Sequence, residues 1–241
     1  MLLSRGAGRI RSERTLRLME EQARLHGADL RPNHRVTSIV SGGDGVAVTA
    51  LDPQGRAEVF RADGVVVTAG AWTERLLGDQ VRLPELVVTE EHPAHFQPAA
   101  ECRDARWPSF NHLVAAGEGL RKGDVYGMFT PGEGVKVGFH GTGPRIDPDR
   151  RTFAGTEQAR RDLADHVARW FPGLDPGSAA EISCTYTTTT GDDFVMDRRG
   201  AITIGAGFKG EGFKFVPAVG QLLADLALGE AESPEVFRLP G

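Results

Sequence analysis

The sequence predicts a mixed α/β protein with a hairpin-rich antiparallel part. Three amphipathic stretches with helical spacing are interspersed with short β-branched runs, and residues 64–70 form a continuous apolar run that ends in glycine. Helix patterns mixed with strand patterns are typical of α+β and mixed α/β domains. A chain of 241 residues, 40% hydrophobic and 25% charged, can bury a substantial core. This composition excludes a collagen-like repeat and a mainly disordered chain.

The N-terminal third is expected to form one helix and then antiparallel hairpins. Residues 12–26 carry apolar side chains on one helical face and charges opposite, and Gly27 follows as a stop signal. The apolar run 64–70 is of the kind found in a central strand covered on both faces, as in a parallel sheet. Turn sequences rich in glycine and aspartate separate the other expected strands, at residues 30–40, 46–51 and 57–61.

The rest of the chain is expected to alternate strands with two more helices. Residues 156–171 share an apolar face and end at Pro172-Gly173, and residues 218–228 form the last helix. A hairpin is expected across the turn 131–134. The expected strands cover residues 86–90, 126–129, 135–140, 181–190 and 201–204.

Charge and cysteine content narrow the class of function. The net charge of −5 argues against a nucleic-acid-binding protein, which usually has a basic patch. The arginines of residues 5–17 are interrupted by glutamates, so we interpret them as the wet face of a helix, with a targeting or polyanion-binding segment as the alternative. No apolar stretch approaches the roughly 20 residues that span a membrane. Two cysteines and no secretory signal predict a cytoplasmic protein without a disulfide framework, and no metal site is expected.

A glycine-rich turn offers the first candidate binding site. Gly205, Gly207 and Gly210 spell G-x-G-x-x-G after a strand and before a helix, a spacing that brings backbone N–H groups close to an anion. A dinucleotide-binding unit also needs a second parallel strand after the helix, and too few residues follow here. The turn is therefore either structural or a different kind of ligand contact. Asp192, Asp193 and Asp197 nearby are expected to be turn and surface residues.

Cys184 and Lys136 are the candidate reactive side chains. Cys184 stands in a polar strand, either as an inert core thiol or as a nucleophile or attachment point. Lys136 should point to the face opposite Val135 and Val137, the face that it shares with Gly138 and His140. A solvent-facing lysine and a buried, functional lysine both remain open from the residues alone.

Five segments together carry a family signal: residues 65–72, 134–140, 146–149, 184–187 and 205–215. In order and rough spacing they resemble the amine-oxidising flavoenzymes of the D-amino-acid-oxidase superfamily, and within it the sarcosine oxidase and N-methyltryptophan oxidase group. Each segment alone is weak, whereas five in order are fairly specific. The resemblance covers nearly the whole chain.

The resemblance implies an FAD cofactor. Cys184 matches the cysteine that in this family attaches FAD covalently through the flavin 8α-methyl group. Residues 207–213 would direct backbone N–H groups at the pyrimidine end of the flavin. The residues implied to contact the cofactor are Cys184, Val36, Thr68, Ala69, Gly70, Gly207, Gly210, Gly212, Phe213 and Lys214.

The resemblance also implies a catalytic set and a reaction. Lys136 matches the lysine thought to activate O₂, since a cation near the flavin stabilises negative charge that develops on oxygen. His140 would tune the site, Tyr186 would line the substrate pocket, and Lys214 would bind the substrate carboxylate. The implied reaction removes a hydride next to the nitrogen of a secondary amino acid, giving an imine, while O₂ becomes hydrogen peroxide. Cyclic secondary amines and glycine are alternative substrates.

One departure from the family pattern concerns the start of the chain. The family begins with a strand, a G-x-G-x-x-G turn and a helix that bind the FAD pyrophosphate, and this sequence begins after that point. We therefore expect a truncated FAD-binding Rossmann-like domain with an unpaired sheet edge, plus an antiparallel-sheet substrate domain. A non-catalytic fragment, or a subunit whose protein partner supplies the missing FAD-binding segment, is the alternative. The expected divisions are 1–80 and 181–241 for the FAD domain and 81–180 for the substrate domain.

Overall fold

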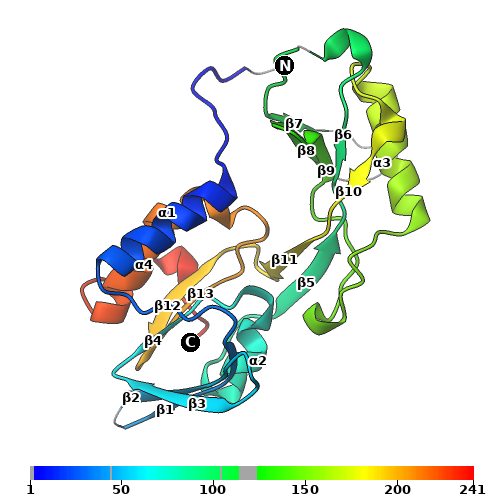
Figure 1. Cartoon of the computed structure of the whole chain (residues 1–241). Helices are drawn as coiled ribbons and strands as arrows, with labels where there is room; N and C mark the ends of the chain where they lie inside the picture. The colour runs from blue at the N-terminus through cyan, green and yellow to red at the C-terminus, as the bar shows by residue number, and fades with distance from the viewer. Residues whose placement is uncertain (1–2, 44, 104, 114–123) are drawn as a thin grey trace. The chain divides into compact units, whose positions relative to one another are not determined.

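The computed structural model describes residues 3–43, 45–103, 105–113 and 124–241. The chain divides into two compact units: one formed by Val88–Tyr186 with the residues up to Arg9, the other by Ile10–Val87 and Thr187–Gly241. Strands β5 (Leu86–Glu91) and β11 (Cys184–Thr189) pair with each other and carry the chain across the division (Figure 1). The predicted mixed α/β class is confirmed. Within the described residues, no helix has the length and apolar character needed to cross a membrane.

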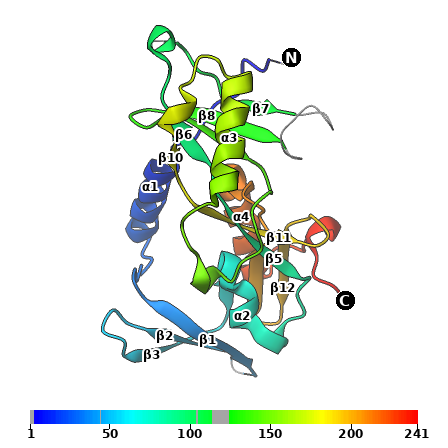
Figure 2. The ribbon, with the colours of Figure 1, turned by 90° about the vertical axis from the view of Figure 1, so that its right-hand side faces the viewer.

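An antiparallel sheet forms the first unit, and a helix covers one of its faces. Helix α3 (Glu157–Trp170) lies across the sheet (Figure 2), and its Leu163 and Val167 pack with Val135 and Val137 of the sheet. The predicted hairpin is confirmed, with Thr130 paired to Gly134 at its turn. In sheet order the strands are β10 (Ala180–Glu181), β6 (Ala94–Phe96), β9 (Gly134–Phe139), β8 (Val125–Thr130) and β7 (Phe110–His112).

Helix α3 begins and ends where the sequence indicates. The Thr156 side chain accepts a hydrogen bond from the backbone N–H of Ala159 at 3.1 Å, which satisfies one of the unpaired donors of the first turn. The helix ends at Trp170, two residues before Pro172. The prediction of a helix over residues 156–171 is therefore confirmed to within a residue at each end.

The second unit contains an antiparallel three-stranded meander. Its strands β1 (Arg35–Gly42), β2 (Gly45–Leu51) and β3 (Ala57–Ala62) pair in sequence order, as predicted. β1 begins later than the predicted residue 30. Pro32 has no N–H to donate, and Asn33 has a φ of 60°, so the preceding residues cannot continue the ladder.

A second three-stranded sheet forms the core of this unit. Strand β13 (Ile202–Ala206) pairs antiparallel with β12 (Val195–Arg199) and parallel with β4 (Val65–Val67). Helix α4 (Val216–Leu228) packs on the sheet through Leu223 and Leu226 (Figure 1). The parallel pairing of the apolar run 64–70 is as predicted. The prediction that this run forms a central strand is wrong among the described residues, where β4 pairs only with β13 and Val66 is 43% exposed.

Helix α1 (Ser12–Leu25) forms where the sequence predicts it but buries no side chain. Leu16, Leu18 and Met19 are each between 41 and 51% exposed. The short helix α2 (Thr73–Leu77) buries Thr73 and Leu77. The apolar face of α1 is thus an uncovered surface of the second unit among the residues that the structure describes.

Candidate functional site

Strand β9 separates a core face from a polar face. Val135 and Val137 are fully buried among the side chains of the first unit's core. Lys136 lies between them and pairs in register with His95 of β6 and Met128 of β8. Because side chains alternate along a strand, Lys136 points away from the core, as predicted.

Tyr126 lies beside Lys136 on this polar face. The Lys136 Nζ is 5.5 Å from the centroid of the Tyr126 ring, within the range of a cation–π interaction. Tyr126 is directly opposite Gly138 in the ladder, and a Cβ on Gly138 would lie only 3.2 Å from the Tyr126 ring and 2.7 Å from Pro93 Cβ. Gly138 thus leaves the space that the Tyr126 ring occupies. The sequence analysis missed Tyr126, although the hairpin turn fixes its register.

Cys184 and Tyr186 are two residues apart on β11, so their side chains share one face of the strand, and both act on the Tyr126 phenol. Burial raises the pKa of Tyr126 well above its ordinary value, and the neighbouring Tyr186, to which it hydrogen bonds, and Cys184 raise it further. A phenol with such a pKa stays protonated at neutral pH and can donate a hydrogen bond. The structure therefore brings two of the predicted residues to the Lys136 face through Tyr126.

His140 completes the cluster. Its Nδ1 is 3.4 Å from the Tyr186 hydroxyl, and the two rings have centroids 5.2 Å apart. The Tyr126 ring meets His140 edge-on, with centroids 6.4 Å apart. The three predicted catalytic residues, Lys136, His140 and Tyr186, thus lie around one phenol within a single unit.

Lys136 has no carboxylate partner among the described residues. The Lys136 charge also acts on His95, its in-register neighbour on the adjacent strand. Burial lowers the pKa of His95 below its ordinary value, Glu133 opposes this shift, and the Lys136 charge adds to it. A half-buried ammonium without a counter-ion is suited to stabilise negative charge on a bound molecule.

A buried carboxylate holds the strand that carries Cys184. Glu90 is 1% exposed, and its side chain accepts hydrogen bonds from the Ser183 hydroxyl at 2.6 Å and from the Phe153 N–H at 2.9 Å. Burial raises the pKa of Glu90, but the hydrogen bonds from Ser183, Thr152 and Phe153 outweigh it, and the pKa lies below its ordinary value. The Arg151 guanidinium donates to Ser183 as well. Ser183, next to Cys184, is thereby fixed in place.

The predicted nucleotide-contacting residues gather at one sheet edge of the second unit. β4 and β13 are parallel, so their carboxyl ends lie together. Thr68, Ala69 and Gly70 follow β4, and Gly207 follows β13. Ligands of open α/β sheets bind outside the carboxyl ends of parallel strands. Gly70 has a φ of 53°, and no heavy atom lies within 4 Å of the position its Cβ would take.

The backbone conformation and close packing of the turn after β13 also explain why glycines occupy it. Gly207 has a φ of 74°, and a Cβ there would lie 2.6 Å from the Thr189 side chain. Gly210 also has a left-handed backbone, with a φ of 73°. A Cβ on Gly212 would contact the Phe208 ring. Within the described residues, the only element after α4 is the 3₁₀ turn Glu235–Phe237.

The remaining predicted residues belong to other elements than β4 and β13. Phe213 and Lys214 belong to the 3₁₀ turn Gly212–Phe215, where the Lys214 ammonium donates to the Glu211 carbonyl at 3.1 Å. Lys214 is exposed and belongs to the second unit. Val36 lies on β1, in the other sheet of that unit, and is 36% exposed.

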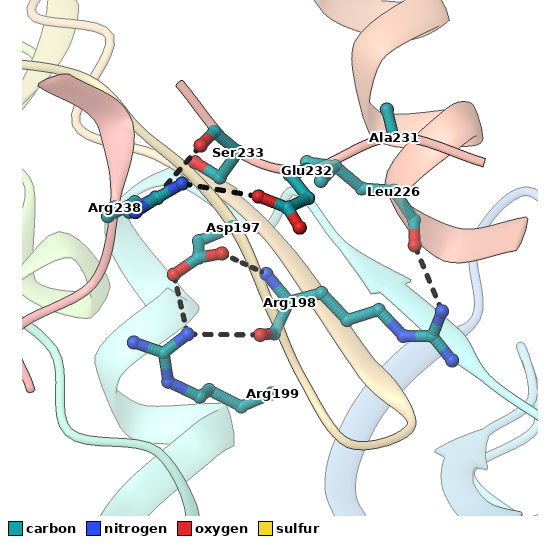
Figure 3. A pocket seen from close by; sticks show the side chains of 8 residues that line it. All are labelled: Asp197, Arg198, Arg199, Leu226, Ala231, Glu232, Ser233 and Arg238. Carbon is teal, nitrogen blue, oxygen red and sulfur yellow. Dashed lines mark hydrogen bonds and ion pairs between the residues drawn. The ribbon is translucent and has the colours of Figure 1, made fainter. Parts of the chain in front are cut away.

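An arginine-lined hollow of about 390 Å³ in the second unit is a structural clamp (Figure 3). Arg198 donates to the Leu226 carbonyl at the end of α4, and Arg199 donates to Asp197 at 2.6 Å. Asp197 also accepts the Leu239 N–H at 2.9 Å and is 6% exposed, so the expectation of a surface aspartate is wrong. Its burial is stable because these donors replace water. The clamp fastens the last residues to β12.

Comparison with known proteins identifies the family. The model of the FAD dependent oxidoreductase family (DAO) matches residues 1–226. The chain therefore belongs to this family of flavoenzymes. It is 31% identical to the human peroxisomal sarcosine oxidase over 94% of its own length, and 28% identical to N-methyl-L-tryptophan oxidase of Salmonella heidelberg over 99%. The expectation drawn from the five segments is confirmed at the level of the family.

The fold agrees with a solved member of the same kind. The open form of NikD, described as an unusual amino acid oxidase, superposes with a TM-score of 0.77 at 25% identity over 92% of this chain. The chain spans 58% of the human protein, 62% of the Salmonella protein and 57% of the NikD chain. It therefore corresponds to a little more than half of each relative.

The residues present fit an FAD cofactor. The open space beside Gly70 at the carboxyl ends of two parallel strands is suited to the approach of a ligand to the backbone. In the first unit, the Lys136 ammonium lies over the Tyr126 ring and Cys184 contributes to raising the pKa of that phenol, so a cation and a thiol belong to the same polar cluster. Both sets lie within the part of the chain that the family model matches.

Proposed function

We propose that this chain provides the substrate-oxidising residues of an FAD-dependent amino-acid oxidase that converts a secondary amino acid to an imine. The observation that carries the proposal is the cluster of Lys136, His140, Tyr186 and Cys184 around Tyr126. The family match and the similarity to sarcosine oxidases support it. Hydrogen peroxide would be the product formed from O₂.

When bound, FAD supplies the two-electron acceptor for the hydride taken from the carbon next to the amine nitrogen. Lys136 provides positive charge without a carboxylate partner among the described residues, and stabilises the negative charge that develops on O₂. His140 and Tyr186 form a hydrogen-bonded pair that orients the amine. Lys214, in the second unit, binds the substrate carboxylate.

We further propose that Cys184 would hold the flavin covalently through a thioether to its 8α-methyl carbon, with the two hydrogens lost in forming this bond passing to O₂ as hydrogen peroxide. Its thiol belongs to a strand held by the Glu90–Ser183 hydrogen bond, so the sulfur has a fixed position. The protein is denatured in acid, and the Cys184 peptide is examined for yellow colour and for a mass increase equal to a flavin. Cys184→Ser should lose the increment, and Cys102→Ser, which changes the other free cysteine, should keep it. A colourless protein with a free thiol at Cys184 would contradict attachment in this chain.

The carboxylate-binding role of Lys214 predicts a difference between substrates. Lys214→Met should raise KM for an acidic secondary amine at least about tenfold, because a charge-assisted contact is lost. KM for a neutral secondary amine of similar size should change less than about twofold. An equal rise in KM for both amines would contradict a role for Lys214 in binding the substrate carboxylate. A panel that includes sarcosine, a cyclic secondary amino acid and glycine then defines the substrate.

A protein partner is the second proposal, supported by two uncovered features of the second unit. Among the described residues β4 has one free edge, and α1 exposes Leu16, Leu18 and Met19. A polypeptide that adds a parallel strand to β4 would cover both kinds of apolar surface and bring nucleotide-binding residues. FAD binding is measured with the chain alone and with the N-terminal two fifths of a sarcosine oxidase added. Binding by the chain alone would make the partner unnecessary.

A further inference from the structure

Two adjacent carboxylates on β5, Glu90 and Glu91, are each 1% exposed. Burial of a carboxylate is costly unless hydrogen bonds replace its water. Glu90 takes its hydrogen bonds from the segment 152–153 and from Ser183. Glu91 takes its own from a different segment, the loop that follows His140, so the two side chains hold different parts of the first unit.

The Glu91 carboxylate is bound to the loop after His140 through two backbone donors, and a third donor on β5 satisfies its other oxygen. Its Oε2 accepts the backbone N–H of Thr142 at 3.1 Å and that of Gly143 at 2.9 Å. Its Oε1 accepts the Thr89 hydroxyl at 2.6 Å. Charge-assisted hydrogen bonds of this kind are about twice as strong as neutral ones. The loop is thus fastened two residues beyond His140.

The loop sequence is adapted to this fastening. Gly141 has a φ of 65°, the left-handed conformation that reverses the chain directly after His140. A Cβ on Gly143 would collide with the Glu90 carbonyl and lie 2.8 Å from Glu91 Oε1. On the other side, the His140 N–H donates to the Asp124 carbonyl at 2.9 Å. The backbone on both sides of the imidazole is therefore held.

We propose that Glu91 is a positioning residue that holds the His140 imidazole against Tyr186. Glu91 acts through the loop 141–143. The 3.4 Å approach of His140 Nδ1 to the Tyr186 hydroxyl depends on where that loop is anchored. Glu91 also contributes to raising the pKa of Tyr126, which places its charge near the same phenol. The catalytic consequence rests on the proposed function, whereas the positioning of His140 does not.

The test uses NMR of the isotopically labelled chain without flavin or substrate. Glu91→Met keeps the size of the side chain and removes both acceptor oxygens. We expect the Thr142 and Gly143 amides to exchange at least about tenfold faster. We also expect the His140 ring protons to lose the shift caused by the Tyr126 and Tyr186 rings. Glu91→Gln, which keeps an acceptor oxygen, should show both effects more weakly and serves if the Met variant does not fold.

Glu90→Gln is the matched control, because it changes an equally buried carboxylate one residue away. It should alter exchange at residues 152–153 and shift the His140 signals less than Glu91→Gln does, because Glu90 holds Ser183 before β11 and not the loop after His140. Unchanged His140 signals in both Glu91 variants would overturn the proposal. The same His140 shift in Glu90→Gln would also overturn it, because the effect would then be general loss of stability. Absence of flavin binding would count against the proposed function alone, since these readouts do not use flavin.

In a flavin-loaded preparation, the activity gives a second readout. Glu91→Gln should lower kcat several-fold with KM changed less than about twofold, because the imidazole is misplaced while the carboxylate-binding Lys214 is untouched. A rise in KM with unchanged kcat would contradict positioning of the reacting groups.

Discussion

The Lys136 ammonium lies 5.5 Å from the centre of the Tyr126 ring, on the sheet face opposite the core of the first unit. This contact joins the predicted oxygen-activating lysine to a half-buried tyrosine that is hydrogen-bonded to Tyr186. A protonated phenol beside the cation leaves the lysine charge uncancelled. An ionised phenol at the same place would neutralise it.

Tyr126 should therefore resist ionisation in the folded protein. Burial, with Tyr186 and Cys184, raises its pKa above the ordinary value of 10.0. The chain has two tyrosines, so phenolate absorbance during an alkaline titration reports only Tyr126 and Tyr186. Tyr126→Phe should leave the number of phenols that ionise in the folded protein unchanged. In urea the wild-type chain should titrate one phenol more than the variant. If the folded variant titrated one phenol fewer than the folded wild-type chain, Tyr126 would ionise normally.

The alternation of the β9 residues allowed the face of Lys136 to be predicted from sequence. Val135 and Val137 flank the lysine, and a strand places such neighbours on the opposite face. The hairpin turn also sets Tyr126 opposite Gly138, so the partner of Lys136 could have been counted from the turn. The prediction failed there because no residue type marks Tyr126 as part of a site.

The buried carboxylates that could not be predicted from the sequence are stabilised by hydrogen bonds from residues far away in the chain. Glu90 and Glu91 look like the polar end of a strand, and their burial depends on backbone donors 51 to 63 residues away. Asp197 was expected at the surface for the same reason, since its donor Leu239 is 42 residues further on. Such donors have no local pattern. Apolar periodicity, which is local, located α1, α3 and α4 correctly.

Glu90 should make stability depend on acid pH. Its folded pKa lies below the ordinary 4.5, so its contribution is fully present above that pH and is lost as pH falls through the folded value. Glu90→Gln should cost about 1–3 kcal/mol at neutral pH, because a charged acceptor is replaced by an amide. The variant's free energy of unfolding should also fall less steeply below pH 4.5 in urea titrations. Parallel pH curves for both proteins would contradict the assignment.

His166 should affect stability in a different pH range. Burial lowers its pKa from 6.5 to about 4, and the nearby His112 and Arg169 add to the shift. The unfolded chain binds the proton more readily, so stability should fall as pH decreases from 6.5 towards 4. His166→Phe, which suits the surrounding Phe139, Trp170 and Phe171 rings, should flatten the curve in this range. If His166→Phe kept the wild-type dependence of stability on pH between 6.5 and 4, a group other than His166 would cause that dependence.

Two glycines of the second unit should respond oppositely to alanine. A Cβ on Gly205 would lie 2.8 Å from Leu223 Cδ1 and 3.2 Å from Thr68 Cγ2, so Gly205→Ala should force α4 away from β13 and destabilise by about 1–3 kcal/mol. Gly220 lies in helix α4, and a Cβ added there would meet no neighbouring group within 4 Å outside the helix's own backbone. Gly220→Ala should stabilise by about 1 kcal/mol through helix propensity. Urea unfolding followed by circular dichroism measures both. If Gly205→Ala left the free energy of unfolding unchanged, the glycine would not be required for the close contact between α4 and β13. Its presence in the glycine-rich turn would then be explained by contact with a ligand.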